Sequence, residues 1–144
     1  MAESKIVVGV DGSANSLAAL HVAVEEAALR GASLCIVMAW QLTWSEIAIE
    51  SPAVVKQIVL HNEQILEHAL AEIDHGRAAG VKVTTELVNG HPATELLSAA
   101  SDASMLVVGS RGMSGLAGAL LGSVTHAVVH HAPCPVLVVP PPRA

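Results

Sequence analysis

The sequence predicts an α/β fold, a three-layer sandwich in which helices cover both faces of one parallel β-sheet. Short apolar segments alternate with longer amphipathic ones along the 144 residues, in the order β-α-β-α-β-α-β-α-β. Such alternation is typical of right-handed crossover units. Phe and Tyr are absent, so Val, Leu, Ile and Ala must fill the core, as in sheets buried on both faces. Without a repeat or linker, residues 1–144 are expected to form one domain, ordered from about 5 to 140.

The first strand and helix have clear boundary signals. Lys5–Asp11 is an apolar segment that ends in the turn signal Asp11-Gly12-Ser13. Ser13 is a suitable N-cap for a helix over Ala14–Arg30, which carries one apolar stripe. Gly31 is the expected stop of that helix.

The second strand is followed by the longest predicted helix. Ser33–Trp40 is apolar throughout and predicts a buried strand, whereas residues 41–51 are mixed and predict a loop. Pro52 suits the first turn of a helix, and apolar periodicity extends that helix to about Ala79. Gly80 is its expected end.

The second half of the chain repeats the alternation. Val81–Val88 alternates apolar and polar residues, as expected for a less buried edge strand, and Gly90-His91-Pro92 leads into a short helix over Ala93–Ala100. The remaining predicted elements are a strand at Met105–Val108, a helix over Val124–Val129 that Pro133 breaks, and a strand at Val136–Val139.

Charge and composition exclude several function classes. The net charge of −6 lacks the basic footprint of a nucleic-acid binder. No apolar segment reaches the roughly 18 residues of a membrane span, and the N-terminus lacks the pattern of a signal peptide. Cys35 and Cys134 are too few for a disulfide framework. We therefore expect a cytoplasmic protein without nucleic-acid or membrane partners.

A glycine-spaced stretch near the end of the chain carries the strongest functional signal. Gly109-Ser110-Arg111-Gly112 comes directly after an apolar strand, and nine residues later Gly122-Ser123 opens a helix. Glycines allow backbone amides to approach an anion closely, and the helix N-terminus favours negative charge. The stretch therefore predicts a phosphate-binding loop. A flexible surface loop is the alternative interpretation.

The usual nucleotide signatures are absent from this stretch and from the first strand. The chain has no G-x-x-x-x-G-K-[S/T] motif, and no G-x-G-x-x-G follows the first strand. A second loop, Gly9–Ser13, also follows a strand and carries the carboxylate of Asp11. Ligands of open α/β sheets bind at such strand ends, so the two loops would face one crevice if their strands are neighbours.

Three motifs occur in order along the chain: Val8–Ser13, the spacing Gly109-x2-Gly112-x9-Gly122-Ser123, and the closing segment His131–Val139. Together, in this register, they resemble the universal stress protein family. The resemblance covers nearly the whole chain. It implies the strand order 3-2-1-4-5, a homodimer through the fifth strand (Val136–Val139), and ATP binding, with Mg²⁺ or Mn²⁺ bound through the phosphates as an open possibility. The family often has Asp directly before the fourth strand, where this chain has Ser104 and, earlier, Asp102.

The resemblance also implies which residues contact the nucleotide. Carried over by motif position, the adenine and ribose would be contacted by Gly9, Val10, Asp11, Ala39, Val108 and Gly109. The phosphates would be held by Arg111, Gly112, Gly122, Ser123 and Val124.

Simpler interpretations remain for single residues. Asp11 could bond only its own turn, and Arg111 could be a solvated loop cation. His61, His68 and His75 recur every seven residues, roughly 10 Å apart along a helix, too far to share one ion. His126 and His130 have a spacing that can chelate, but no carboxylate lies near them in sequence. We therefore expect no metal site.

Three functions are compatible with these residues. The favoured one is an adenine-nucleotide-binding regulatory protein whose role in stress responses comes only from the resemblance. The second is a slow ATPase or phosphotransferase, for which the loop offers no lysine and no base other than Asp11. The third is an interaction module, with an empty site or with AMP or cyclic AMP as its ligand.

Overall fold

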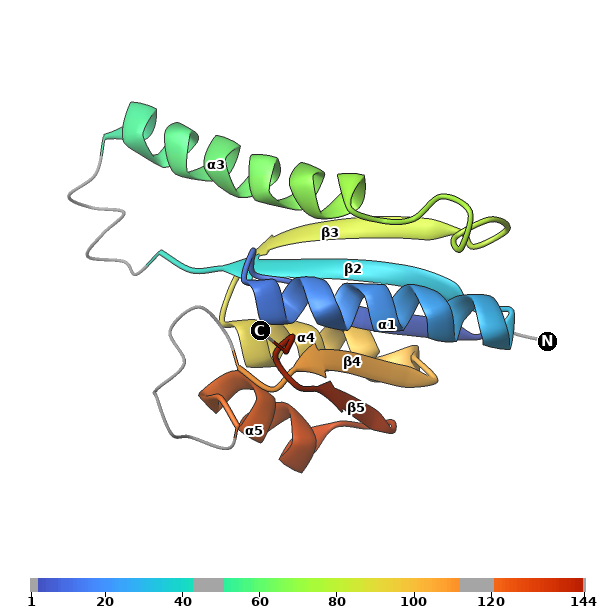
Figure 1. Cartoon of the computed structure of the whole chain (residues 1–144). Coiled ribbons are helices and arrows are strands. Elements are labelled where there is room, and N and C mark those ends of the chain that lie inside the picture. Colours follow the sequence, from blue (N-terminus) through green and yellow to red (C-terminus); the bar gives the residue numbers. More distant parts are fainter. Residues whose placement is uncertain (1–2, 43–50, 112–120, 144) are drawn as a thin grey trace.

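A five-stranded parallel sheet forms the centre of the molecule (Figure 1). The computed structural model describes residues 3–42, 51–111 and 121–143. The strands are β1 (Lys5–Gly9), β2 (Ser33–Trp40), β3 (Val83–Asn89), β4 (Met105–Gly109) and β5 (Val136–Val139). Their order across the sheet is β3-β2-β1-β4-β5. The predicted fold class and strand order are therefore confirmed.

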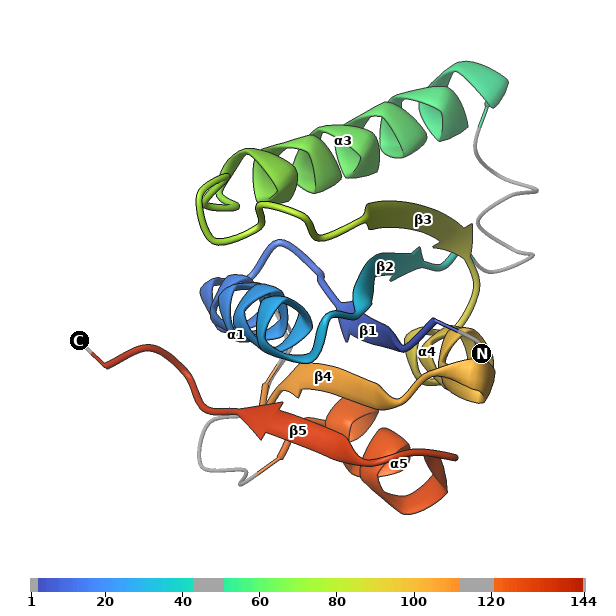
Figure 2. The same ribbon diagram turned by 90° about the vertical axis from the view of Figure 1, so that its right-hand side faces the viewer.

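Helices cover both faces of this sheet. They are α1 (Ala14–Arg30), α3 (Pro52–Ala71), α4 (Pro92–Ala99) and α5 (Ser123–His131), and a 3₁₀ turn, η1 (Ala100–Asp102), follows α4. Figure 2 shows α1 and α3 on one face and α4 and α5 on the other. Each face has its own apolar cluster.

The alternation of side chains along the strands divides the core between the two faces. Ile6 and Val8 pack in the cluster under α1 and α3, whereas Val7 packs in the cluster under α4 and α5. All three side chains are fully buried. Because successive strand residues point to opposite faces, a continuous apolar run is what a doubly covered sheet requires.

Both ends of α1 have the predicted signals. The Ser13 hydroxyl accepts a hydrogen bond from the Ser16 amide at 3.1 Å, which satisfies one of the free amides of the first turn. Gly31 ends the helix in the left-handed conformation, with φ of 63°, and its amide donates to the Ala27 carbonyl. The sequence signals and the observed boundaries agree here.

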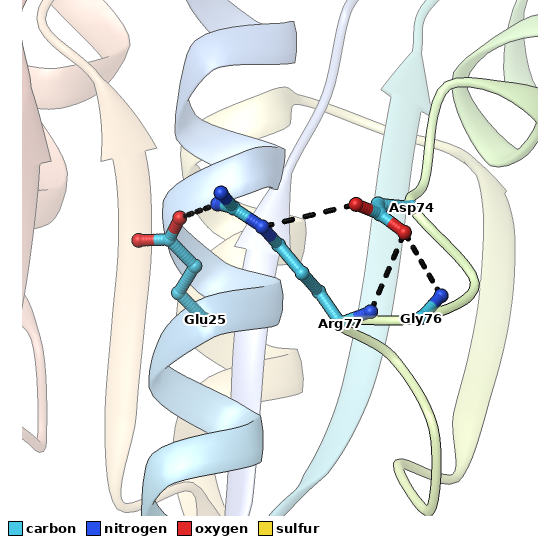
Figure 3. A network of polar contacts seen from close by, with 4 residues as sticks. All are labelled: Glu25, Asp74, Gly76 and Arg77. Atoms are coloured by element: carbon cyan, nitrogen blue, oxygen red, sulfur yellow. Dashed lines mark hydrogen bonds and ion pairs between the residues drawn. The ribbon is translucent and has the colours of Figure 1, made fainter.

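The predicted length of α3 is wrong. The helix ends at Ala71 and not at Ala79. The Asp74 carboxylate accepts hydrogen bonds from the amides of Gly76 (2.8 Å) and Arg77 (3.4 Å), and thereby closes a turn that competes with the helix (Figure 3). The Arg77 guanidinium also pairs with Glu25 of α1, so this turn is attached to the neighbouring helix.

Smaller boundary differences occur at two strands. β1 ends at Gly9, two residues before the predicted end, although the Val10 amide still donates to the Val37 carbonyl at 2.9 Å. β3 begins at Val83 and not at Val81, whose amide instead closes a turn onto the Ala78 carbonyl.

No helix in the described part of the chain is long and apolar enough to cross a membrane.

An ion pair joins two elements at the amino-terminal edge of the sheet. Lys5 Nζ, at the start of β1, lies 2.7 Å from Asp102 Oδ1 in η1. This hydrogen bond raises the pKa of Lys5 and lowers the pKa of Asp102. The departure from the family pattern at Ser104 and Asp102 therefore lies at the edge opposite to the two loops of interest.

Candidate functional site

The two loops that the sequence singles out follow neighbouring strands. β1 and β4 pair in parallel, with Ile6 opposite Met105 and Val8 opposite Val107. Their carboxyl ends therefore lie at the same edge of the sheet, at the left of Figure 1. From β1 the chain crosses to β2 on one side, while β4 lies on the other, so this is the point where the strand order reverses.

The first loop is a turn organised by Asp11. Its carboxylate accepts a hydrogen bond from the Ser13 amide at 2.9 Å, and its own amide donates to the Ser16 hydroxyl at 3.2 Å. Gly12 has φ of 86°, a conformation that favours glycine. Asp11 thus fixes the turn, and a carboxylate with two oxygens can accept more than one donor.

The second loop is closed by two hydrogen bonds between its ends, one of them donated by a side chain. The Gly122 amide donates to the Ser110 carbonyl at 2.7 Å, and the Thr125 hydroxyl donates to the Gly109 carbonyl at 2.7 Å. These bonds place the start of α5 directly beside the end of β4. Gly112 lies outside the described residues.

The N-terminus of α5 faces this edge with amides that its helix does not use. Gly122 is the N-cap and provides no side-chain cap. The first intrahelical bond of the series runs from the His126 amide to the Gly122 carbonyl, 2.9 Å. The preceding amides, of Ser123, Val124 and Thr125, have no intrahelical partner, which is the general property of a helix start. With the exposed Ser123 side chain they form donors suited to an anion.

Packing also leaves little room for a side chain at the glycines that end β1 and β4. A Cβ at Gly9 would lie 3.0 Å from both methyl carbons of Leu96, and one at Gly109 would lie 2.9 Å from Cγ of Asn15. Sequence reasoning assigned these glycines to close approach of a ligand. In the structure, a Cβ would be tight at both positions, against the tip of the Leu96 side chain at Gly9 and against Asn15 at Gly109.

The other sequence-predicted residues contribute in different ways. The side chains of Val10 and Val108 are buried in the two core clusters, so only their backbone can face a ligand. Ala39 is half-buried near the end of β2, opposite Val88 of β3. Arg111 is exposed, and residues 109–124 contain no other Lys or Arg.

Sequence reasoning missed four polar residues that hold the two loops in place. Asn15, Ser16, Ser110 and Thr125 are all buried and hydrogen-bonded at this edge. Buried polar groups require partners, so their burial marks them as structural parts of the site. A polar residue in an apolar helix is the signal that the sequence offers for three of them, whereas Ser110 lies in the loop after β4.

The histidines are distributed over separate surfaces. His61 and His68 of α3 line a cleft of about 390 Å³ with Gly12, Leu17, Gln64 and Ile65. The rings of His126 and His130 lie 4.5 Å apart, centroid to centroid, on exposed positions of α5. In residues 3–42, 51–111 and 121–143, no group of three or more His, Cys, Asp or Glu residues is placed to hold a metal ion.

Cys35 and Cys134 are free thiols, and burial raises the pKa of both.

The model of the universal stress protein family matches residues 3–140. The chain belongs to the universal stress protein family. The resemblance seen in the three motifs is thereby confirmed.

Family members include proteins twice as long as this chain. One universal stress protein of Mycobacterium tuberculosis is 40% identical over 137 residues, which cover 92% of this chain and 44% of that protein. Another from the same organism is 36% identical over 140 residues, covering 94% of this chain and 45% of that protein. The chain thus spans less than half the length of these curated relatives.

Solved universal stress proteins have the same fold. The UspA protein of Lactobacillus plantarum superposes with a TM-score of 0.79 at 26% identity, covering 96% of this chain and 99% of that one. A universal stress protein solved in complex with cAMP has a TM-score of 0.65 at 31% identity, covering 99% of this chain and 100% of that one.

Proposed function

We propose that this chain binds an adenine nucleotide, with ATP as the preferred ligand, between the Asp11 turn and the start of α5. One observation carries the proposal: the pairing of β1 with β4 brings a carboxylate turn and a glycine-flanked helix start to the same sheet edge. The relative solved with cAMP supports an adenine nucleotide as the ligand class.

Each wall of this site suits a different part of the nucleotide. The Asp11 carboxylate can accept hydrogen bonds from ribose hydroxyls or from the adenine amino group, beside backbone of Gly9, Val10 and Ala39. Val108 and Gly109 border the ribose. The amides and hydroxyl at Ser123 and Val124, with Arg111, Gly112 and Gly122, suit the phosphates, and a Mg²⁺ or Mn²⁺ ion would be held through the phosphates.

Binding fits these residues better than rapid hydrolysis does. Phosphoryl transfer needs strong charge neutralisation and a positioned nucleophile, and residues 109–124 supply a single cation, Arg111. We therefore propose a regulatory protein in stress responses, with at most slow turnover of ATP. The role in stress is supported by the family name alone.

A homodimer through β5 is part of the proposal. β5 is the last strand of the sheet, and its residues Val136, Leu137 and Val138 are half-buried. An edge strand presents backbone groups that can pair with a second chain. A cytoplasmic location, supported by the two free thiols, and a single domain over residues 1–144 complete the proposal.

Calorimetric titration tests the ligand class. We expect ATP to bind with a Kd below about 1 mM, which corresponds to a favourable binding free energy of at least roughly 4 kcal/mol. AMP and cAMP, titrated in parallel, rank the ligands, and mass spectrometry of the purified protein detects nucleotide that remains bound. If none of the three produces heat or a thermal shift, the proposal is wrong.

A pair of matched serine variants tests the place of binding. Ser123→Ala removes a hydroxyl at the start of α5, whereas Ser98→Ala removes an exposed hydroxyl from α4 on the same face of the sheet. We expect Ser123→Ala to weaken ATP binding by roughly tenfold, the value of one hydrogen bond to a charged group, and Ser98→Ala to leave it unchanged. Equal effects of the two variants would contradict the proposed site.

A further inference from the structure

One buried amide joins three segments at the candidate site. Asn15, in the first turn of α1, is only 7% exposed. Its Nδ2 donates to the Val139 carbonyl at the end of β5, 2.9 Å away. Its Oδ1 accepts from the Arg111 amide at 2.7 Å and from the Ser110 hydroxyl at 3.3 Å. A single side chain therefore ties α1, the loop after β4 and the end of β5 together.

The fold of α1 itself does not require asparagine at this position. Ser13 already caps the helix, and asparagine is a poorer helix former than alanine or leucine. Among the described residues, the hydrogen bonds of the Asn15 side chain go to segments other than α1, and buried amides are retained where every polar atom has a partner. Within the described residues, no buried side-chain nitrogen or oxygen lacks a partner.

Gly109 leaves the space that this amide occupies. A Cβ at Gly109 would lie 2.9 Å from Cγ of Asn15 and 3.0 Å from its Nδ2. Carbon atoms do not approach so closely, so a larger residue at 109 would displace the amide from its partners. Glycine at 109 and asparagine at 15 are thus matched to one another across the α1–β4 contact.

We propose that Asn15 is a positioning residue for the phosphate side of the candidate site. It fixes where the chain leaves β4, because the first two residues after the strand, Ser110 and Arg111, both bond to its Oδ1. Arg111 is the one cation in residues 109–124, and its backbone amide is held by this bond to Asn15. The proposal rests on the proposed nucleotide binding, and names the residue that holds Ser110 and Arg111 in place.

The first test needs no nucleotide. In Asn15→Leu, which is similar in size but has no polar side-chain atom, the Arg111 amide loses its acceptor. We expect this amide to exchange with deuterated water at least about tenfold faster by NMR, the value of one hydrogen bond. Val24→Ala, a buried change elsewhere on α1, is the control for general destabilisation. Unchanged exchange at Arg111 in Asn15→Leu would overturn the proposal.

The second test separates positioning from stability. ATP carries phosphates and adenosine does not, so loss of a phosphate-loop positioning residue should affect them differently. We expect Asn15→Leu to raise the Kd of ATP by about tenfold and that of adenosine by less than about twofold, as for loss of one hydrogen bond on the phosphate side. Val24→Ala should change neither Kd. Equal weakening of ATP and adenosine by Asn15→Leu would contradict a positioning role.

A second variant covers the case in which Asn15→Leu does not fold. Gly109→Ala keeps Asn15 but places a methyl group against its amide. Because Gly109 itself borders the proposed ribose position, the exchange rate is the readout for this variant: exchange at Arg111 should be faster, and unchanged exchange there would overturn the proposal. If the unmodified chain binds neither ATP nor adenosine, the proposed function fails, and the exchange experiment alone decides whether Asn15 holds the loop.

Discussion

Lys5 and Asp102 show how a single ion pair makes stability depend on pH. The lowered pKa of Asp102 means that its contribution is present above the ordinary carboxyl range and is lost as the pH falls through the lowered value. The raised pKa of Lys5 means that its contribution is present below the ordinary lysine range and is lost as the pH rises through the raised value. The pair therefore stabilises the fold only between these two limits.

The Asp102→Asn variant tests this dependence. We expect it to melt slightly below the unmodified chain near neutral pH, by a small margin because the pair is exposed and screened. The difference should disappear as the pH falls through the lowered pKa of Asp102 and as it rises through the raised pKa of Lys5, because one partner then loses its charge. Thermal unfolding followed by circular dichroism across this range measures it, and Lys5→Met should give the same profile. A difference that does not vary with pH would contradict the assignment.

At the residue scale, local patterns in the sequence point to candidate site residues but not to the residue that holds them in place. Asp11 and Ser123 are candidates because turn and glycine signals are local along the chain. Asn15 could not be identified in the same way. Its partners, Ser110, Arg111 and Val139, are 95 or more positions away, and only the folded sheet brings them together.

At the scale of elements, Gly31 allows the backbone strain at the end of α1 to be measured separately from side-chain contacts. Its φ is 63°, and a Cβ added there would meet nothing within 4 Å. Gly31→Ala should therefore destabilise the chain by about 1 kcal/mol through backbone strain alone. Gly31→Asn is the matched control and should lose less, since asparagine tolerates the left-handed region. Denaturant unfolding of the three proteins measures both changes, and an alanine variant as stable as the parent would refute this account.

The elements also show where sequence patterns stop being sufficient. The ends of α1 were predicted because Ser13 and Gly31 are unambiguous local signals. The end of α3 was missed because apolar periodicity continues past Ala71, while the side chain of Asp74 bonds the following amides and ends the helix. Arg77, held by Glu25 of α1, adds a tertiary contact to this turn that no local pattern contains (Figure 3).

At the scale of the whole molecule, the direction of the backbone groups in β5 makes the proposed dimer testable. The carbonyls of Pro135 and Val139 accept bonds from Leu106 and Ser110, on the β4 side. Because the bonding direction alternates along a strand, the amides of Val136 and Val138 point away from β4, toward the open edge of the sheet. These outward amides are the groups that a second copy of β5 would use.

Val138→Pro therefore separates dimerisation from folding. Proline removes the outward amide of residue 138, and proline is tolerated on edge strands where no bond within the sheet is lost. If two chains pair through β5, this variant should be monomeric by light scattering, while Val138→Ala, which keeps the amide, should remain dimeric. Both variants keep every hydrogen bond between β4 and β5, so a folded Val138→Pro dimer would place the contact between chains on another surface.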